Sequence, residues 1–112
     1  MEIKDFVKLV KNFTTEDITI DEGHVRRRCE ENDISVCEVK EILLKQNKRL
    51  IRITRDRPGT YKLYYRLARD VELKVIINIV EKGKINIRTV KRLDEEVRKQ
   101  GGAFKISLGI FK

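Results

Sequence analysis

The spacing of apolar residues changes near the middle of this chain and divides it into a helical half and a strand half. Up to Gln46, apolar residues recur every three or four positions, which is the period of an amphipathic helix. We expect helices over residues 2–12, 22–31 and 35–46, and a short extended segment over 18–20.

Two of these helices carry capping signals. Ser35 precedes the third helix with Glu38 three residues later, which is the spacing of a capping box. Asp21 can cap the second helix, because a carboxylate accepts hydrogen bonds from the unpaired N–H groups of a first helical turn. These residues therefore predict where both helices begin.

After Lys48, apolar and polar residues alternate, which is the pattern of a half-buried strand. Turns of a few residues, such as the one at Pro58-Gly59, make neighbouring strands antiparallel. The strand over 71–80 is the most apolar, so we expect it at the centre of the sheet. The four expected strands cover residues 48–55, 60–67, 71–80 and 84–92.

The last twenty residues predict two further elements, a short polar helix over 93–100 and an alternating edge strand over 104–110. No repeat or linker interrupts the chain, and 112 residues suffice for one modest core. The sequence therefore predicts a single α+β domain over 1–112. Its short helices pack on a mostly antiparallel sheet of four to five strands.

Charge is distributed unevenly over this domain. The net charge is +8, with residues 1–47 at −3 and residues 48–112 at +11. Between Lys48 and Arg69, eight basic residues stand against Asp56 alone. Because a surface of one sign attracts polyanions, nucleic acid is the first expected partner and an acidic protein the second. A solvated surface without a partner is the alternative.

Strand alternation predicts which basic side chains share a face. If the polar sides of the strands coincide, one face of the sheet packs on the helices and the other presents cations around a tyrosine. Arginine binds phosphate oxygens in pairs, and tyrosine can stack on a base or supply a proton. Any sheet with one solvated face gives the same pattern. The polar sides carry Lys62, Tyr64, Arg66, Lys74, Arg88 and Arg92.

Several classes of protein are excluded. No run of about 18 apolar residues could cross a membrane, and residues 1–5 lack a signal-peptide pattern, so we expect a cytoplasmic protein. Two cysteines eight residues apart with one histidine do not form a zinc site. The glycines form no nucleotide-binding motif. We therefore expect no metal and no cofactor.

The single histidine offers the most specific chemistry. His24 and Arg28 are four residues apart and share one face of the second helix. The pair combines a group that moves protons near neutral pH with a permanent cation, which suits a phosphodiester. Two other interpretations stay open: the face binds an anion without chemistry, or the histidine is simply satisfied at a packed edge.

Several short motifs, together with this pair, resemble the RelE/ParE-type toxin superfamily, and especially its BrnT-like and related branches. The resemblance covers residues 18–92, and it leaves 1–17 as an N-terminal helical extension and 93–112 as a C-terminal extension. The motifs are His24-x-x-x-Arg28, Asp33-Ile34-Ser35, Glu38-Val39, Ile42-Leu43, Lys62-Leu63-Tyr64-Tyr65-Arg66 and Ile85-Asn86-Ile87-Arg88-Thr89-Val90.

The resemblance implies a RelE-like fold and a metal-independent ribonuclease that acts on RNA or at the ribosome and is neutralised by an acidic antitoxin. His24 and Arg28 match the helix motif of the family, and Arg66 and Arg88 match its basic positions on the sheet. Some members of the superfamily lack ribonuclease activity, and some poison a topoisomerase instead. The resemblance therefore leaves open whether this chain is an enzyme.

Together these arguments predict two sets of site residues. In a ribonuclease, His24 would be the base or acid, Tyr64 or Lys62 its complement, and three arginines would hold the phosphate. A non-catalytic nucleic-acid-binding module and a protein-interaction subunit, including a homodimer through the tail Phe104–Phe111, are the alternatives. The catalytic set is His24, Arg28, Tyr64, Arg66 and Arg88, and the RNA-binding set is Arg27, Arg52, Lys62, Lys74 and Arg92.

Overall fold

The computed structural model describes residues 1–81 and 84–94 as one α+β unit, which confirms the predicted fold class. Short 3₁₀ turns at Thr15–Asp17 and Asn47–Arg49 connect the regular elements. The helices are α1 (Ile3–Val10), α2 (His24–Glu31) and α3 (Val36–Lys45). The strands are β1 (Ile18–Ile20), β2 (Leu50–Arg57), β3 (Thr60–Ala68), β4 (Val71–Glu81) and β5 (Lys84–Asp94).

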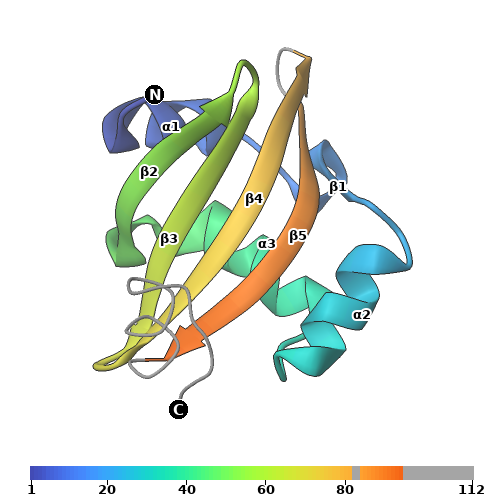
Figure 1. Ribbon diagram of the computed structural model, residues 1–112. Coiled ribbons are helices and arrows are strands. Elements are labelled where there is room, and N and C mark those ends of the chain that lie inside the picture. Colours follow the sequence, from blue (N-terminus) through green and yellow to red (C-terminus); the bar gives the residue numbers. More distant parts are fainter. Residues whose placement is uncertain (82–83, 95–112) are drawn as a thin grey trace.

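The five strands form one sheet in the order β1-β5-β4-β3-β2. Strands β2 to β5 are a run of antiparallel neighbours, whereas β1 pairs with β5 in parallel. The apolar strand β4 is the central one, as its composition predicts. Figure 1 shows α1 and α3 behind the sheet and α2 beside the lower half of β5.

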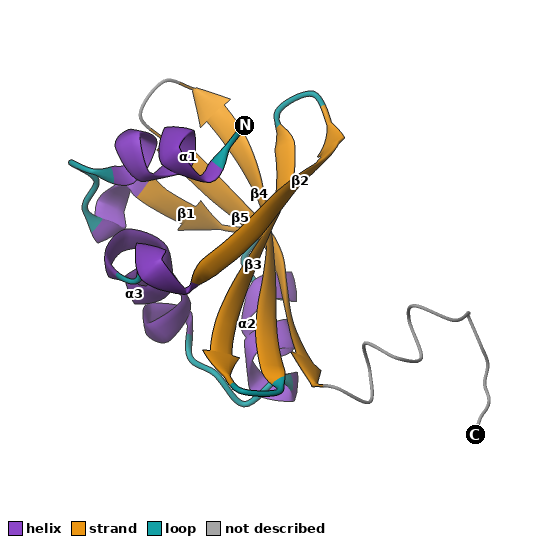
Figure 2. Cartoon of the chain, turned by 90° about the vertical axis from the view of Figure 1, so that its left-hand side faces the viewer, coloured by secondary structure: helices purple, strands orange, loops and turns teal. Residues whose placement is uncertain are grey.

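The core lies between the sheet and the three helices. The turned view of Figure 2 shows α1 and α3 on one side of the strands, and α2 adds buried residues of its own. Alternate residues of the strands point into it, and burial of each such side chain contributes about 1.5–3 kcal/mol. From the sheet come Ile18, Leu50, Leu63, Tyr65, Leu73, Val75, Ile77, Ile85, Ile87 and Val90, and from the helices Phe6, Val10, Val25, Cys29, Val39, Ile42 and Leu43.

The predicted capping box begins α3. The Glu38 N–H donates to Ser35 Oγ over 3.0 Å, and the Ser35 N–H donates to Glu38 Oε1 over 2.9 Å. The cap predicted for α2 was wrong. That helix begins at His24 behind Gly23, whose φ of 78° turns the chain in a conformation that side chains disfavour. The Asp21 carboxylate is therefore free to reach the sheet.

A β-bulge in β5 changes which side chains share a face. Ile77 pairs with Ile87 and Ile76 pairs with Thr89, so Arg88 is an extra residue in the strand. Beyond the bulge, even-numbered residues of β5 point to the helix-covered side of the sheet, whereas before it odd-numbered residues do. Arg92 consequently lies opposite Leu73, on the helix-covered side, and the prediction that it shares the polar face was wrong.

Strand β5 also extends further than predicted. Leu93 and Asp94 continue the strand, opposite Glu72 and Val71, where the sequence predicts the start of a helix. The rest of that helix, the edge strand over 104–110 and the dimer through the tail lie outside the described residues.

Candidate functional site

The face of the sheet opposite α1 and α3 is rich in polar and basic side chains, and no helix of the described ranges lies over it (Figure 1). We call it the uncovered face. Its residues follow from the cross-strand register of the four long strands. They include Arg52, Thr54, Arg57, Thr60, Lys62, Tyr64, Arg66, Glu72, Lys74, Ile76, Asn78, Asn86, Thr89, Lys91 and Leu93.

Three lysines lie close together on the uncovered face. Lys74 on β4 pairs directly with Lys91 on β5. Lys62 on β3 lies diagonally opposite Lys74. None of them forms an ion pair with another described residue. Burial lowers the pKa of Lys74, and the charges of Lys62 and Lys91 lower it further. Like charges placed opposite each other destabilise a sheet, so the arrangement suits an anion that neutralises them.

The cross-strand row that contains Lys74 and Lys91 also holds an aromatic side chain covered by a cation, because Arg52 pairs with Tyr64 and Tyr64 pairs with Lys74. The Arg52 guanidinium carbon lies 4.0 Å from the centre of the Tyr64 ring. Arg52 also forms an ion pair of 3.4 Å with Glu72, whose side chain is buried. Arg66 is exposed and pairs across the strands with Glu72. The Arg52 guanidinium therefore covers one face of the Tyr64 ring, and the two planar groups form a stack on the uncovered face.

Helix α2 reaches the uncovered face because it docks on the edge of β5 below β1. The Asn32 amide makes the connection: its Nδ2 donates to the Val90 carbonyl over 3.5 Å, and its Oδ1 accepts from the Arg92 N–H over 2.8 Å. The same Nδ2 donates to the Arg28 carbonyl over 2.7 Å, so one side chain ties the end of α2 to the strand. Beyond the end of β1, the Asn32 side chain at the end of α2 thus supplies hydrogen-bond partners for backbone groups at the edge of β5.

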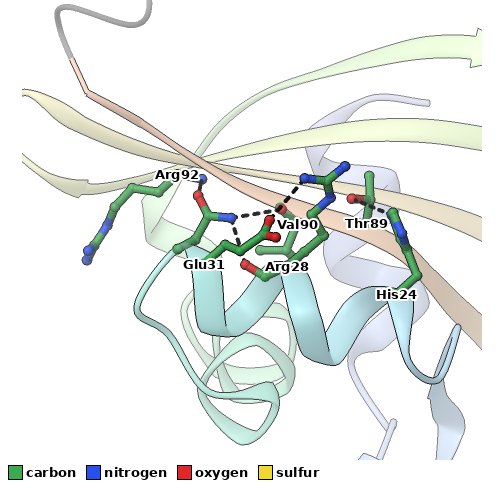
Figure 3. A network of polar contacts seen from close by, with 7 residues as sticks. His24, Arg28, Glu31, Thr89, Val90 and Arg92 are labelled. Atoms are coloured by element: carbon green, nitrogen blue, oxygen red, sulfur yellow. Dashed lines mark hydrogen bonds and ion pairs between the residues drawn. The ribbon is translucent and has the colours of Figure 1, made fainter.

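This docking brings the histidine to the sheet, as Figure 3 shows. His24 Nε2 lies 3.2 Å from Thr89 Oγ1, and the ring is half-buried. Arg28 lies one turn further along α2 and forms an exposed ion pair of 3.0 Å with Glu31. The imidazole and the lysine group therefore border the same surface, which sequence alternation by itself does not reveal.

A carboxylate network holds the extra arginine of the bulge. Arg88 Nε donates to Asp21 Oδ2 over 2.8 Å, and Asn86 Nδ2 donates to Asp21 Oδ1 over 2.7 Å. Thr19 in turn donates to the Asn86 side-chain oxygen over 2.7 Å. Asp21 thus orients Arg88 beside His24. Sequence reasoning missed this role because Asp21 precedes a helix and resembles a cap.

Two adjoining concavities occupy the part of the uncovered face next to α2, and Ile76 and Thr89 line both. The first concavity, of about 380 Å³, is lined by Asp21, His24, Asp56, Arg57, Thr60, Ile76, Arg88 and Thr89. The second concavity, of about 290 Å³, is lined by Arg28, Glu31, Asn32, Lys74, Ile76, Thr89, Val90 and Lys91.

Part of each predicted site set gathers at these concavities, and the rest lies elsewhere. His24, Arg28 and Arg88 of the catalytic set border them, and Lys74 joins from the RNA-binding set. Lys62 is adjacent, because it pairs with Ile76 across the strands.

The remaining predicted residues stand apart from His24. Tyr64 is two strands from β5, which is about 10 Å at the usual strand spacing, and Arg66 lies further along the same strand. Arg52 covers Tyr64, and Arg27 is exposed on α2 without lining either concavity. In Figure 3 the Arg92 side chain points away from His24.

The described residues contain no cluster that could hold a metal through three or more His, Cys, Asp or Glu side chains. The two cysteines are free thiols: Cys29 is buried in α2, and Cys37 is exposed on α3. Burial raises the pKa of the Cys29 thiol, which disfavours its reactive thiolate form. Neither thiol lines the two concavities.

Neither a search for membrane-crossing helices nor a comparison with known proteins indicates a function. In the part of the chain that the structure describes, no helix has the length and apolar character needed to cross a membrane. Comparison with protein-family models, with curated proteins and with solved structures gives no match for this chain. The chemistry of the uncovered face is therefore what indicates a function.

Proposed function

We propose that this protein binds single-stranded RNA along the uncovered face. The observation that carries the proposal is the group of Lys62, Lys74 and Lys91, which has no ion-pair partner among the described residues. Phosphate oxygens would supply the missing counter-charges and release the counterions that neutralise the nucleic acid in solution.

A single strand fits this face better than a duplex. Single strands bind to sheets by laying their phosphates along basic side chains and stacking their unpaired bases on flat ones. The stacked pair of Arg52 and Tyr64 offers such a flat surface, in the same cross-strand row as Lys74 and Lys91. We therefore expect the affinity for single-stranded RNA to depend on salt and to include a contribution from base stacking.

The test is a titration of fluorescently labelled oligouridine with the protein, followed by anisotropy at about 50 mM and about 200 mM salt. We expect wild-type affinity to fall with salt, and the salt slope to decrease by about 2 when all three lysines become glutamine, since each single-strand phosphate contact contributes about 0.7. The matched control replaces three exposed lysines on the other side of the sheet, Lys8 and Lys11 at the end of α1 and Lys45 at the end of α3, by glutamine. Equal losses in both triple variants would contradict the proposal.

A second function, metal-independent cleavage of the bound RNA, is favoured by the contact between His24 and Thr89. In this reaction His24 takes the proton of a 2′-hydroxyl, whose oxygen attacks the adjacent phosphorus. The P–O5′ bond breaks, a 2′,3′-cyclic phosphate forms, and the 5′-oxygen takes a proton from a lysine ammonium such as that of Lys74. Arg28 and Arg88 would stabilise the added charge. Such an enzyme would be of the RelE/ParE-like toxin type; its acidic antitoxin and any action at the ribosome stay predictions.

Cleavage is tested separately from binding. We expect the wild-type protein to cut single-stranded RNA in the presence of EDTA, and His24→Ala to bind that RNA without cutting it. An oligonucleotide with 2′-deoxy sugars should bind and remain whole, because it lacks the attacking hydroxyl. Binding of RNA without cleavage by the wild type would reject the second function and leave the first in place.

A further inference from the structure

The two concavities of the uncovered face differ in charge. The second concavity is lined by Arg28, Lys74 and Lys91, with Glu31 as its acidic member, and Glu31 is paired with Arg28. The first concavity is lined by two carboxylates, Asp21 and Asp56, together with two arginines. A phosphate therefore suits the second concavity, whereas the first offers acceptors as well as donors.

The two carboxylates of the first concavity are not equivalent. Both oxygens of Asp21 already accept a hydrogen bond, because Arg88 donates to one and Asn86 to the other. Asp56 contacts Arg57 alone among the described residues, over 3.8 Å, and its side chain is 39% exposed. That distance is too long for a hydrogen bond, so both oxygens of Asp56 are left to accept from a ligand.

The remaining lining suits a flat ligand with polar edges. Ile76 supplies an apolar, half-buried floor at the centre of the face. The Thr60 hydroxyl already donates to Asn78 Oδ1 over 2.7 Å, so it can only accept from a ligand. Small-molecule sites of this kind combine an apolar surface with a few polar groups that fix orientation.

We propose that the first concavity is a nucleobase subsite that selects guanine, while the phosphate next to that base lies in the second concavity. The Watson–Crick edge of guanine presents N1–H and N2–H side by side, and a carboxylate accepts both. Adenine and cytosine present one amino group beside a ring acceptor, and uracil presents one N–H between two carbonyls. Arg57, adjacent to Asp56, can donate to guanine O6 and N7.

This inference rests on the proposed RNA binding, and the experiment separates the two. Anisotropy compares oligouridine with oligouridine that carries one central guanosine, adenosine, cytidine or inosine. We expect the guanosine strand to bind the wild type at least about fivefold more tightly than the adenosine strand. Inosine, which keeps N1–H but lacks the N2 amino group, should lose most of that preference.

Asp56→Asn is the matching variant, because it keeps the shape and replaces one acceptor oxygen by a donor. It should lose the preference for guanosine and keep its affinity for oligouridine. Asp70→Asn, in the exposed turn between β3 and β4, removes the same charge elsewhere and should keep the preference.

The outcomes are distinct. Equal wild-type affinity for guanosine and adenosine strands, or an unchanged preference in Asp56→Asn, overturns the guanine subsite and leaves RNA binding intact. Absence of binding to every strand overturns the proposed function, and the subsite falls with it. The comparison of guanosine with inosine uses the wild-type protein alone, so it does not depend on how a variant folds.

Discussion

Replacing Lys74 by glutamine should make the protein more stable and weaken its binding of RNA. In the unliganded protein, Lys74 is partly buried directly opposite Lys91 and diagonal to Lys62. A cross-strand pair of like charges costs about 0.2–1 kcal/mol, and solvent screening keeps the total for a half-exposed group near the lower end. We expect a gain of about 0.5 kcal/mol in the free energy of unfolding, which corresponds to about 3 °C in melting temperature.

The same substitution removes a phosphate contact. We expect affinity for single-stranded RNA to fall about fivefold, for a loss of about 1 kcal/mol, and the salt slope to decrease by about 0.7. Urea unfolding and fluorescence anisotropy measure the two effects on one preparation. Lys45→Gln, which removes the same charge from α3, should change neither quantity in this direction.

The pH dependence gives the effect on stability a second signature. The pKa of Lys74 lies below its ordinary 10.5 in the folded protein, so the folded state binds this proton less tightly than the unfolded chain. The wild-type protein is therefore not destabilised by Lys74 above pH 10.5, where the amine is neutral in both states. It loses stability as the pH falls through the lowered pKa and Lys74 becomes charged in the folded protein. The advantage of Lys74→Gln over the wild type should therefore be largest near neutrality and shrink towards pH 10.5.

A Lys74→Gln variant that is less stable at neutral pH, and that binds RNA as tightly as the wild type, would refute both expectations. That result would mean that Lys74 acts as a packing residue whose aliphatic stem matters more than its charge. A loss of affinity with an unchanged salt slope would also contradict a direct phosphate contact.

Three further predictions concern the residues around this face. Asn32→Ala should lower the free energy of unfolding by about 1–2 kcal/mol, measured in urea, because the link between α2 and the Arg92 N–H is lost; a change below about 0.3 kcal/mol would contradict that docking. Asp21→Asn should weaken the ion pair that positions Arg88, so the rate of RNA cleavage should fall while the affinity for oligouridine stays unchanged. An unchanged cleavage rate would mean that Arg88 takes no part in the reaction. Tyr65→Phe should leave stability unchanged or raise it by about 1 kcal/mol in thermal unfolding, since the buried hydroxyl has no partner among the described residues; a clear loss would reveal a hidden hydrogen bond.

Local patterns in the sequence predict those elements that depend on neighbouring residues. The capping box of Ser35 and Glu38 begins α3 as expected, and the turn at Pro58-Gly59 closes the hairpin, with Gly59 at a φ of 80°. The high share of apolar residues in β4 predicts its central place, because a strand with two neighbours is buried along most of its length. In each case the signal and the structure involve the same few residues.

The features that build the candidate site depend on contacts between distant segments, and local patterns do not encode them. The bulge at Arg88 interrupts a strand that contains no glycine or proline at that point, so simple alternation assigned Arg92 to the wrong face. Asp21 looks like a helix cap, yet its carboxylate binds Arg88 across 67 positions of sequence. The docking of α2 on β5 depends on the Asn32 amide, whose partners are backbone groups. The sequence thus supplies the reactive groups, and tertiary contacts decide which of them meet.

Mapping the backbone amide signals by nuclear magnetic resonance during titration with oligouridine tests the central claim most directly. If RNA binds the uncovered face, the largest shifts will fall on Lys74, Ile76 and Thr89, and the amides of Val39 and Leu43 in α3 will stay in place. Shifts concentrated on α1 and α3, or no shifts at RNA concentrations above those of the protein, would contradict the account.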